Sequence, residues 1–404
     1  MKYLCIGMSL SDAQKKKIQD RGGHILSGYY GSQAILDGLD SQGIVVDSIN
    51  SFKHISPSVL KIIEEDTWSR TGKSHDYSIG YTNRKYTQHI EREYKLVKAA
   101  KDWAVKNSDD EAVVFVYNMH TPFMAAADAI KKINPKTKIV QIIPDIPQYM
   151  DLSASRFKKV LKKIDWLQIK HFMKNVDKYV LYSKPMADFL KLPDDKWIVM
   201  EGIFDADLHQ NNVIKNDNTV SIMYSGLLEL NFGIPELLDA MEFLPENYEL
   251  WITGNGNAVE MIKKRASDDK RIKLFGFLPS REDLLNKQAE ATMLISTRKD
   301  TEIASQFCFP SKLFEYMVSG NPVISCRLGG IPDEYFNYLI ELPSVTPKDI
   351  AETVKNVMSM SSEERNKIGE AQKRFVLEEK NKYAQGKKLL DFARDTRDTA
   401  IVYE

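Results

Sequence analysis

The feature that most constrains the fold of this chain is a repeated alternation of short apolar runs with longer helical patterns. In the first half the apolar runs have the length of strands, and they cover residues 3–7, 44–48, 112–117, 138–143 and 178–182. Helical patterns lie between them, at residues 31–42, 88–106 and 122–133. Strands separated by helices in this order are typical of a parallel sheet that is covered on both faces. We therefore predict a βαβ domain at residues 1–204.

The same alternation begins again after a polar, turn-rich segment at residues 209–219. The second set of predicted strands covers residues 220–224, 248–253, 272–275, 291–296 and 322–325. The helices predicted around them cover residues 235–242, 258–266, 281–288, 311–318 and 347–360, and a charged helical stretch follows at 362–397. Thr346 is placed to cap the helix that begins at residue 347. The pattern predicts a second domain at residues 205–380, and so an α/β protein with two similar halves.

The charge balance and the cysteine count exclude several classes of protein. Lys plus Arg and Asp plus Glu are both 56, so the formal net charge of the 404 residues is zero. A dedicated nucleic-acid binder needs an excess of cations to neutralise phosphates, and we therefore expect no nucleic-acid partner. Cys5, Cys308 and Cys326 lack the spacing of zinc ligands, and we expect no metal and no cofactor. Because no window approaches the ~20 apolar residues of a membrane-spanning helix, we expect a cytoplasmic protein.

Residues 309–324 (FPSKLFEYMVSGNPVI) carry the most informative chemistry. Pro310 suits the first turn of a helix, whose free backbone N–H groups attract an anion, and Lys312 adds a cation in the same turn. Ser311 and Glu315 share one helix face, where the carboxylate is suited to accept two hydroxyl hydrogens of a ribose. The pattern indicates a site for a nucleoside diphosphate. An ordinary helix of a βαβ unit, with a chance Lys and Glu, is the alternative.

This segment resembles the Pro-Ser-Lys-x-x-Glu-Tyr-x-x-x-Gly-x-Pro-Val pattern of the retaining glycosyltransferases of family 4, in their capsule and exopolysaccharide branch. The resemblance covers most of residues 220–345. It implies the GT-B fold, with two Rossmann-like domains whose parallel sheets face a cleft and a C-terminal helix, within residues 381–404, that returns toward the N-terminal domain. It also implies a set of donor-binding residues: Gly226, Gly254, Phe277, Arg298, Ser311, Lys312, Leu313 and Glu315.

The chain departs from the family pattern at two donor positions. Family members commonly carry an Arg and a Lys that point at the donor diphosphate, and this chain has Leu227 or Leu228 and Phe232 there. A diphosphate carries about two negative charges, so Arg298 and Lys312 would have to supply the cations. For Arg298, a solvated surface position is an equal alternative.

Three features of the first half are candidates for the sugar and acceptor side. The Gly-rich segment at residues 21–31 follows the first strand, and the family's equivalent loop faces the donor, which singles out Gly22 and Gly23. His120 and Asp145 follow two neighbouring predicted strands, where the strand ends of an open α/β sheet meet a ligand. The alternatives are a flexible loop at 21–31, a histidine that is satisfied at a helix start, and an aspartate that caps a turn.

The resemblance implies a transfer without a protein nucleophile, in which the leaving phosphate takes the acceptor's proton and the protein orients the substrates. The catalytic candidates are His120, Asp145, Arg298 and Lys312. The expected donor is a nucleotide sugar, a UDP-linked hexose, and the expected acceptor is a glycan or a lipid-linked glycan in polysaccharide biosynthesis. Two other functions stay open: a non-catalytic partner subunit with the same fold, and a sugar-nucleotide epimerase.

Residues 156–174 combine apolar residues at helical spacing with a local excess of lysine, including Lys158, Lys159, Lys162 and Lys163. A basic amphipathic helix lies on anionic lipid, so this segment predicts a peripheral position on the inner face of a membrane. The alternative is a packed surface helix with a solvated lysine face.

Overall fold

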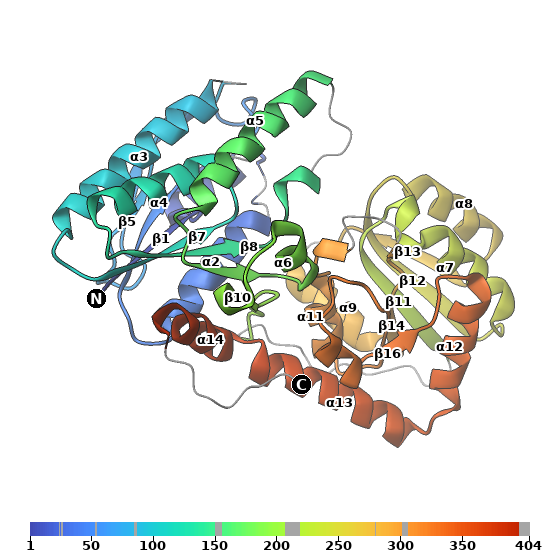
Figure 1. The fold of residues 1–404 in the computed structure, drawn as a ribbon. Coiled ribbons are helices and arrows are strands. Elements are labelled where there is room, and N and C mark those ends of the chain that lie inside the picture. The colour runs from blue at the N-terminus through green and yellow to red at the C-terminus, as the bar shows by residue number, and fades with distance from the viewer. Residues whose placement is uncertain are drawn as a thin grey trace. The chain divides into compact units, whose positions relative to one another are not determined.

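The computed structural model describes residues 1–23, 25, 27–52, 55–84, 87–149, 156–206, 219–278, 280–300 and 306–395. The chain divides into two compact units (Figure 1). Unit 1 comprises residues 1–182, residues 186–203 and the segment from Lys382 onward. Unit 2 comprises residues 183–185 and residues 204–381. Most of the polar segment that we predict at 209–219 lies outside the described residues.

Unit 1 is built on an eight-stranded sheet with the order β10-β9-β8-β7-β1-β2-β5-β4. Its strands are β1 (Lys2–Gly7), β2 (Val46–Asn50), β4 (Asp66–Trp68), β5 (Asp76–Ser78), β7 (Ala112–Tyr117), β8 (Lys138–Ile143), β9 (Lys178–Leu181) and β10 (Trp197–Val199). Neighbouring strands are parallel, apart from the antiparallel pair β4–β5. A separate antiparallel pair joins β3 (Ile62–Ile63) to β6 (Tyr81–Thr82). β7 is buried along its whole length because it lies between two other strands and under helices.

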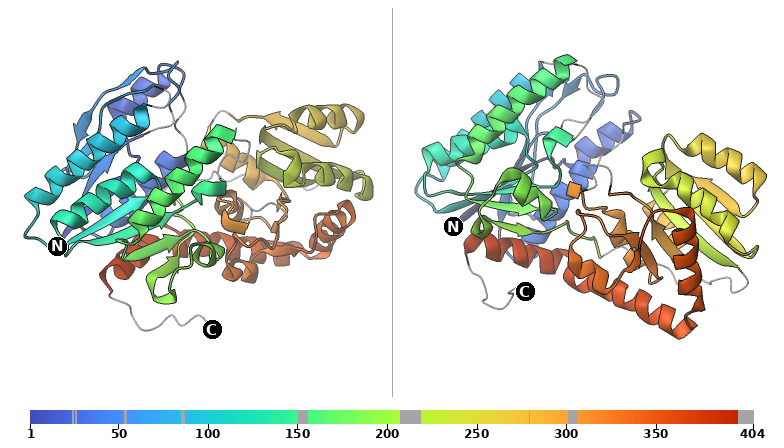
Figure 2. Two further views of the ribbon diagram at one scale, coloured as in Figure 1. Left: turned by 45° about the horizontal axis from the view of Figure 1, so that its top comes forward. Right: turned by 45° about the vertical axis from the view of Figure 1, so that its right-hand side comes forward.

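The helices of unit 1 cover both faces of this sheet (Figures 1 and 2). They are α1 (Asp12–Gln19), α2 (Ser27–Asp40), α3 (Gln88–Lys106), α4 (Thr121–Ile133), α5 (Arg156–Met173), α6 (Pro185–Leu190), α14 (Lys382–Arg394) and the short η1 (Pro147–Tyr149) and η2 (Asp194–Lys196). α3, α4 and α5 lie over one face, and α2 and α14 pack together over the other.

Unit 2 has a six-stranded parallel sheet with the order β13-β12-β11-β14-β15-β16. Its strands are β11 (Val220–Leu227), β12 (Tyr248–Asn255), β13 (Ile272–Gly276), β14 (Met293–Ser296), β15 (Val323–Cys326) and β16 (Ile340–Leu342). Its helices are α7 (Ile234–Ala240), α8 (Val259–Asp268), α9 (Arg281–Glu290), α11 (Lys312–Val318), α12 (Pro347–Ser359), α13 (Ser362–Glu379) and the short η3 (Leu230–Phe232), η4 (Met241–Phe243) and η5 (Asp333–Asn337). One buried apolar cluster joins the sheet to these helices.

The ten strands that the sequence predicts are all present, within two residues at their starts and three at their ends, and they form the two predicted parallel sheets. Thr346 caps α12 as expected, because its hydroxyl accepts from the backbone N–H of Asp349 at 3.2 Å. The additional strands β4, β5, β10 and β16 are three residues long and lie at or near the sheet edges. Runs this short show too little periodicity to be recognised in a sequence.

Two segments differ in detail from the pattern that the sequence shows. The segment at 21–31 is not a loop throughout, since α2 already begins at Ser27 and includes two of its glycines. The charged helical stretch at 362–397 comprises α13 and α14, because the chain leaves the helix at Lys380, and α14 is the helix expected within residues 381–404. The carbonyl oxygen of Lys380 accepts from the backbone N–H of Phe204 at 2.7 Å, and its ammonium binds Glu334 at 2.6 Å. These tertiary contacts fix the break.

A close helix crossing holds α14 on α2. The two helices meet at Gly38 and Gly386, and a Cβ atom at residue 386 would lie 2.0 Å from the carbonyl oxygen of Gly38. At the far end of α14, Arg394 donates to the Tyr3 hydroxyl at 2.7 Å, and Lys138 pairs with Asp395 at 2.5 Å. The C-terminal helix is therefore an integral part of unit 1.

We expect Gly386→Ala to lower the free energy of unfolding by about 1–3 kcal/mol, because the added methyl group overpacks the crossing and must push the helices apart. Chemical denaturation followed by circular dichroism measures the change. Lys387→Ala, one residue along on the exposed side of the same helix, is the control and should stay within about 0.5 kcal/mol of the parent. Equal stability of the Gly386 variant and the parent would contradict the close crossing.

Candidate functional site

The carboxyl end of the unit 2 sheet opens where β11 and β14 diverge. These strands are paired at Ile222–Met293 and Met223–Leu294. Two residues further on, the side of Ser225 that would face β14 is occupied by a side chain from α11. The Tyr316 hydroxyl donates to the Ser225 carbonyl oxygen at 2.7 Å and accepts from the Ser225 N–H at 2.8 Å. Burial raises the pKa of Tyr316 to about 12, so this hydroxyl keeps its proton. The contact places α11 beside the end of β11.

Three charged side chains come together at the start of α11, and we call them the charged trio: Arg281, Lys312 and Glu315. The ammonium of Lys312 lies 2.9 Å from Oε2 of Glu315, and Nε of Arg281 lies 3.4 Å from Oε1. Glu315 is 9% exposed, whereas the two cations are close to half exposed. A Cβ atom at Gly226 would lie 3.8 Å from Cγ of Lys312, so the trio adjoins the end of β11. The two cations and one carboxylate leave one excess positive charge.

A third cation lies on the loop after β14. The guanidinium of Arg298 stacks 4.7 Å from the ring centre of Phe232, the last residue of η3. The hydroxyl of Thr297 donates to the Phe232 carbonyl oxygen at 2.9 Å and holds the two loops together. Leu228 is buried, and Leu227 is 55% exposed. An exposed leucine and an aromatic ring under an arginine therefore stand where the family resemblance leads one to expect basic residues.

The remaining donor candidates are placed around the same sheet edge. Gly254 pairs with Gly226 in the β11–β12 ladder, and a Cβ atom there would lie 1.8 Å from the Gly226 carbonyl oxygen, so the strand contact itself requires glycine. Phe277 follows β13 and is 83% exposed. Ser311 precedes α11 and is exposed. Leu313 is buried, and its N–H donates to the Pro310 carbonyl oxygen at 2.8 Å.

The candidates of unit 1 lie after neighbouring strands of its sheet. His120 is the residue before α4, close to the end of β7, and Asp145 follows β8, which pairs with β7. The intervening residue Asn118 has a left-handed φ of 77°, an unusual conformation for a non-glycine residue. Burial raises the pKa of Tyr117, and the charge of Asp145 contributes. Asp145 therefore lies near the buried hydroxyl of Tyr117.

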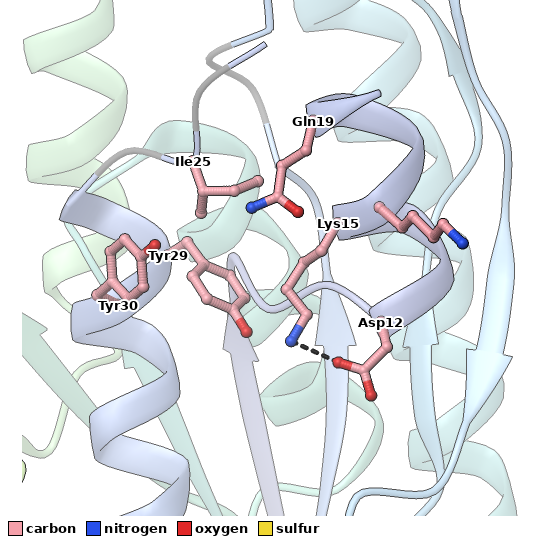
Figure 3. Close-up of a pocket in the computed structure, with 7 residues that line it drawn as sticks. Asp12, Lys15, Gln19, Ile25, Tyr29 and Tyr30 are labelled. Atoms are coloured by element: carbon pink, nitrogen blue, oxygen red, sulfur yellow. Dashed lines mark ion pairs between the residues drawn. The ribbon is translucent and has the colours of Figure 1, made fainter. Parts of the chain in front are cut away.

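Gly22 and Gly23 lie in the segment that joins α1 to α2, and residues of these two helices line a pocket of about 360 Å³ (Figure 3). The pocket is lined by Asp12, Lys15, Lys16, Gln19, Ile25, Tyr29 and Tyr30. Lys15 pairs with Asp12 at 2.5 Å, and its ammonium lies 5.7 Å from the ring centre of Tyr29. The Tyr30 ring is 58% exposed and stands edge-on to Tyr29. Ring surface, charge and amide groups in one pocket are suited to a saccharide.

Sequence reasoning missed four of these residues. Tyr316 stands inside the recognised motif, but its partner Ser225 is 91 residues away. Arg281 begins a different helix from Glu315, and no local pattern marks it. Lys15 and Tyr30 of the pocket belong to two helices that only the tertiary fold brings together.

Three further observations on the described residues bear on what the chain can do. Among the described residues, no group of three or more His, Cys, Asp or Glu side chains is placed to hold a metal ion. Burial raises the pKa of Cys5 and of Cys326 to about 12, so these thiols are poor nucleophiles. None of the helices that the structure describes is long and apolar enough to cross a bilayer.

Comparison with known proteins identifies the class of unit 2 and the fold of the whole chain. Residues 219–360, all within unit 2, match the family model "Glycosyl transferases group 1". The fold is similar to that of the lipopolysaccharide outer core galactosyltransferase WaaB, with a TM-score of 0.62, 15% identity and coverage of 98% of this chain and 100% of that one. No curated protein sequence matches the chain significantly.

Two further structures share the fold over their whole length. HepE from Anabaena, in complex with UDP, has a TM-score of 0.63 at 10% identity and covers 98% of this chain and 100% of its own. Sucrose-phosphate synthase from Thermosynechococcus elongatus has a TM-score of 0.65 at 13% identity, with coverage of 98% and 99%. The protein thus has the GT-B fold, and its two Rossmann-like units confirm the predicted fold class. With a group 1 glycosyltransferase domain at 219–360, it is a glycosyltransferase.

Proposed function

We propose that this enzyme is a retaining glycosyltransferase of family 4 that moves a hexose from a UDP-linked sugar to a glycan or lipid-linked acceptor in polysaccharide biosynthesis. The observation that carries the proposal is the pair Lys312–Glu315 beside Gly226. An ammonium suited to phosphate and a carboxylate suited to ribose hydroxyls are adjacent, as phosphate and ribose are in a nucleotide. The complexes of HepE with UDP and with UDP-glucose support the choice of donor.

The other donor contacts follow from this placement. The exposed ring of Phe277 is available to stack on the base. Arg298, oriented by its stacking on Phe232, supplies positive charge from the side of β14, together with Lys312 from α11. This arrangement is the chain's own replacement for the basic residues that the family carries at the positions of Leu227 or Leu228 and Phe232.

In the proposed reaction, the bond from the anomeric carbon to the diphosphate oxygen breaks while the acceptor oxygen bonds to the same face of that carbon. The acceptor's proton passes to the departing phosphate oxygen, and the products are the glycoside and the nucleoside diphosphate. Lys312 and Arg298 stabilise the charge that develops on the leaving group. No metal and no other cofactor takes part in this proposal.

We place the sugar and acceptor side in unit 1, at His120, Asp145 and the segment that holds Gly22 and Gly23, with the two glycines facing the donor. The support is their position at the carboxyl ends of strands or near the pocket between α1 and α2. The exposed Tyr30 ring and the charged groups of that pocket are suited to the apolar face and the hydroxyl groups of a sugar. His120 and Asp145 then orient the reacting hydroxyl and the donor sugar.

We also propose that α5 docks on anionic lipid at the cytoplasmic face of a membrane, where a lipid-linked acceptor would be met. Four apolar side chains of this helix are 42–66% exposed: Val160, Leu161, Ile164 and Leu167. A helix packed through its apolar side would bury them instead. Lys163, Lys170 and Lys174 are exposed near them and complement an anionic surface. The side chains of residues 156–159 lie outside the described part.

The purified enzyme should release UDP from a UDP-hexose when membrane lipid or glycan extract is supplied, and release should be slow without it. A panel of UDP-, GDP- and ADP-sugars in a nucleoside-diphosphate release assay identifies the donor. Nuclear magnetic resonance of the product then gives the anomeric configuration, which should equal that of the donor. A product with the inverted anomeric configuration would contradict the retaining mechanism. If no donor released its nucleoside diphosphate, the result would contradict catalysis and favour the non-catalytic partner subunit.

Glu315→Ala should weaken UDP binding by about 2 kcal/mol, because hydrogen bonds from the ribose hydroxyls to a charged group are lost. The sharper measurement compares UDP with 2′,3′-dideoxy-UDP by calorimetry. The parent should prefer UDP, and the variant should bind both alike, since the two deletions remove the same contact. Glu249→Ala is the control, because Glu249 pairs with Lys273 near the start of β12, away from the carboxyl end of that strand. An undiminished preference in the Glu315 variant would contradict the ribose assignment.

The double variant Lys162→Glu, Lys163→Glu should sediment less with vesicles of phosphatidylcholine and phosphatidylglycerol than the parent, because the surface charge is reversed. Lys263→Glu, on helix α8 of unit 2, should behave as the parent. Vesicles of phosphatidylcholine alone should bind all three proteins less. A parent that fails to bind the anionic vesicles would refute the docking proposal.

A further inference from the structure

The charge balance beside β11 raises a problem for donor binding. Lys312 and Glu315 are within 2.9 Å of each other, and as a pair they carry no net charge. The diphosphate of a nucleotide sugar carries about two negative charges, and its strongest contacts are with cations. A neutral pair offers such a ligand little long-range attraction. A further cation at this point of the site would change the balance.

Arg281 supplies that cation. It is the first residue of α9, and the N-terminal capping box of Ser280 and Asp283 fixes the backbone there. Its Nε lies 3.4 Å from Oε1 of Glu315, on the opposite carboxylate oxygen from Lys312. The guanidinium also lies 5.9 Å from the ring centre of Phe204, within the range of a cation–π contact. The side chain is thus directed to Glu315 while 45% of it remains exposed to solvent.

The ion pair of Arg281 with Glu315 is loose. A separation of 3.4 Å exceeds the 2.7–3.2 Å range that is usual for an N–H···O hydrogen bond. Because 45% of the Arg281 side chain is exposed, water competes for its guanidinium, and an ion pair with one solvated partner contributes little to stability. Stabilising the fold is therefore a weak reason for an arginine here. The geometry is better suited to a guanidinium that exchanges the carboxylate of Glu315 for a phosphate oxygen of a ligand.

We propose that Arg281 is a donor-binding residue that contributes positive charge to the diphosphate. The inference rests on the proposed function, and it names a residue outside the recognised motif. In the ligand-free protein Arg281 and Lys312 share the carboxylate of Glu315. When the ribose hydroxyls bind Glu315, the phosphate groups replace that carboxylate as the anionic partner of Arg281 and Lys312. Arg281 thereby compensates, together with Arg298, for the basic residues absent at Leu227 or Leu228 and Phe232.

Calorimetric titration with UDP, at several salt concentrations, tests the assignment. Arg281→Ala should weaken binding roughly tenfold or more, because a charge-assisted contact is lost. Arg281→Lys should remain within a few-fold of the parent, since the charge is kept. The affinity of Arg281→Ala should also fall less steeply with added salt, because one fewer charge takes part. The melting temperatures of both variants should stay close to that of the parent.

Arg265→Ala is the matched control. Arg265 is in the same unit on α8, its side chain is 36% exposed, and its guanidinium pairs with Asp239 and, at 3.4 Å, with Glu242. This variant should bind UDP as the parent does.

Three results would overturn the inference. Unchanged UDP affinity in Arg281→Ala would contradict a contact between Arg281 and the donor diphosphate. Equal losses in the Ala and Lys variants, with the parent's salt dependence, would mean that Arg281 acts by holding Glu315 in place and not by its charge. A parent that binds none of UDP, GDP and ADP would contradict the proposed function and this inference with it, whereas the first two results leave the proposed function intact.

Discussion

The candidate donor site depends on one buried hydroxyl group, that of Tyr316. The pairing of β11 with β14 ends after Met223, so the N–H and C=O groups of Ser225 on the β14 side require other partners. The tyrosine satisfies both, at 2.8 and 2.7 Å. Because a buried backbone group without a partner costs about 1–3 kcal/mol, this contact strongly restricts where α11 can lie. Lys312 and Glu315 belong to the same short helix, so their position beside Gly226 follows from it.

A second contact fixes the other end of α11. The helix ends at Val318, and the backbone of Gly320, two residues further on, is so close to α13 that a Cβ atom at Gly369 would lie 2.0 Å from the Gly320 carbonyl oxygen. The site therefore combines a backbone held at both ends with cations on long side chains. Such a design positions a ligand by its fixed groups and leaves the charges able to exchange partners.

The sequence was most informative where neighbours in space are neighbours along the chain. The strands in the middle of both sheets are apolar runs flanked by helical patterns, and the pattern predicts them well. Lys312 and Glu315 were recognised because a single helix turn brings them together. The helix break at Lys380 depends on tertiary contacts, which no local pattern shows. The start of α2 at Ser27 lies in a Gly-rich segment, where the composition suggests a loop. Arg281 reaches Glu315 across 34 residues, and no local spacing encodes that approach.

The departures from the family pattern are explained by the helices and loops on which the cations of unit 2 lie. The loop after β11 has an exposed leucine at 227 and the ring of Phe232, and this ring carries the guanidinium of Arg298 from the loop after β14. Stacking on an aromatic ring keeps an arginine charged and oriented. Arg281 plays the corresponding part from α9, beside the ring of Phe204. Positive charge is thus carried by the loop after β14, by α9 and by α11, around the apolar loop after β11. A search for the family's basic residues along the loop after β11 therefore finds none, although unit 2 supplies cations from these other elements.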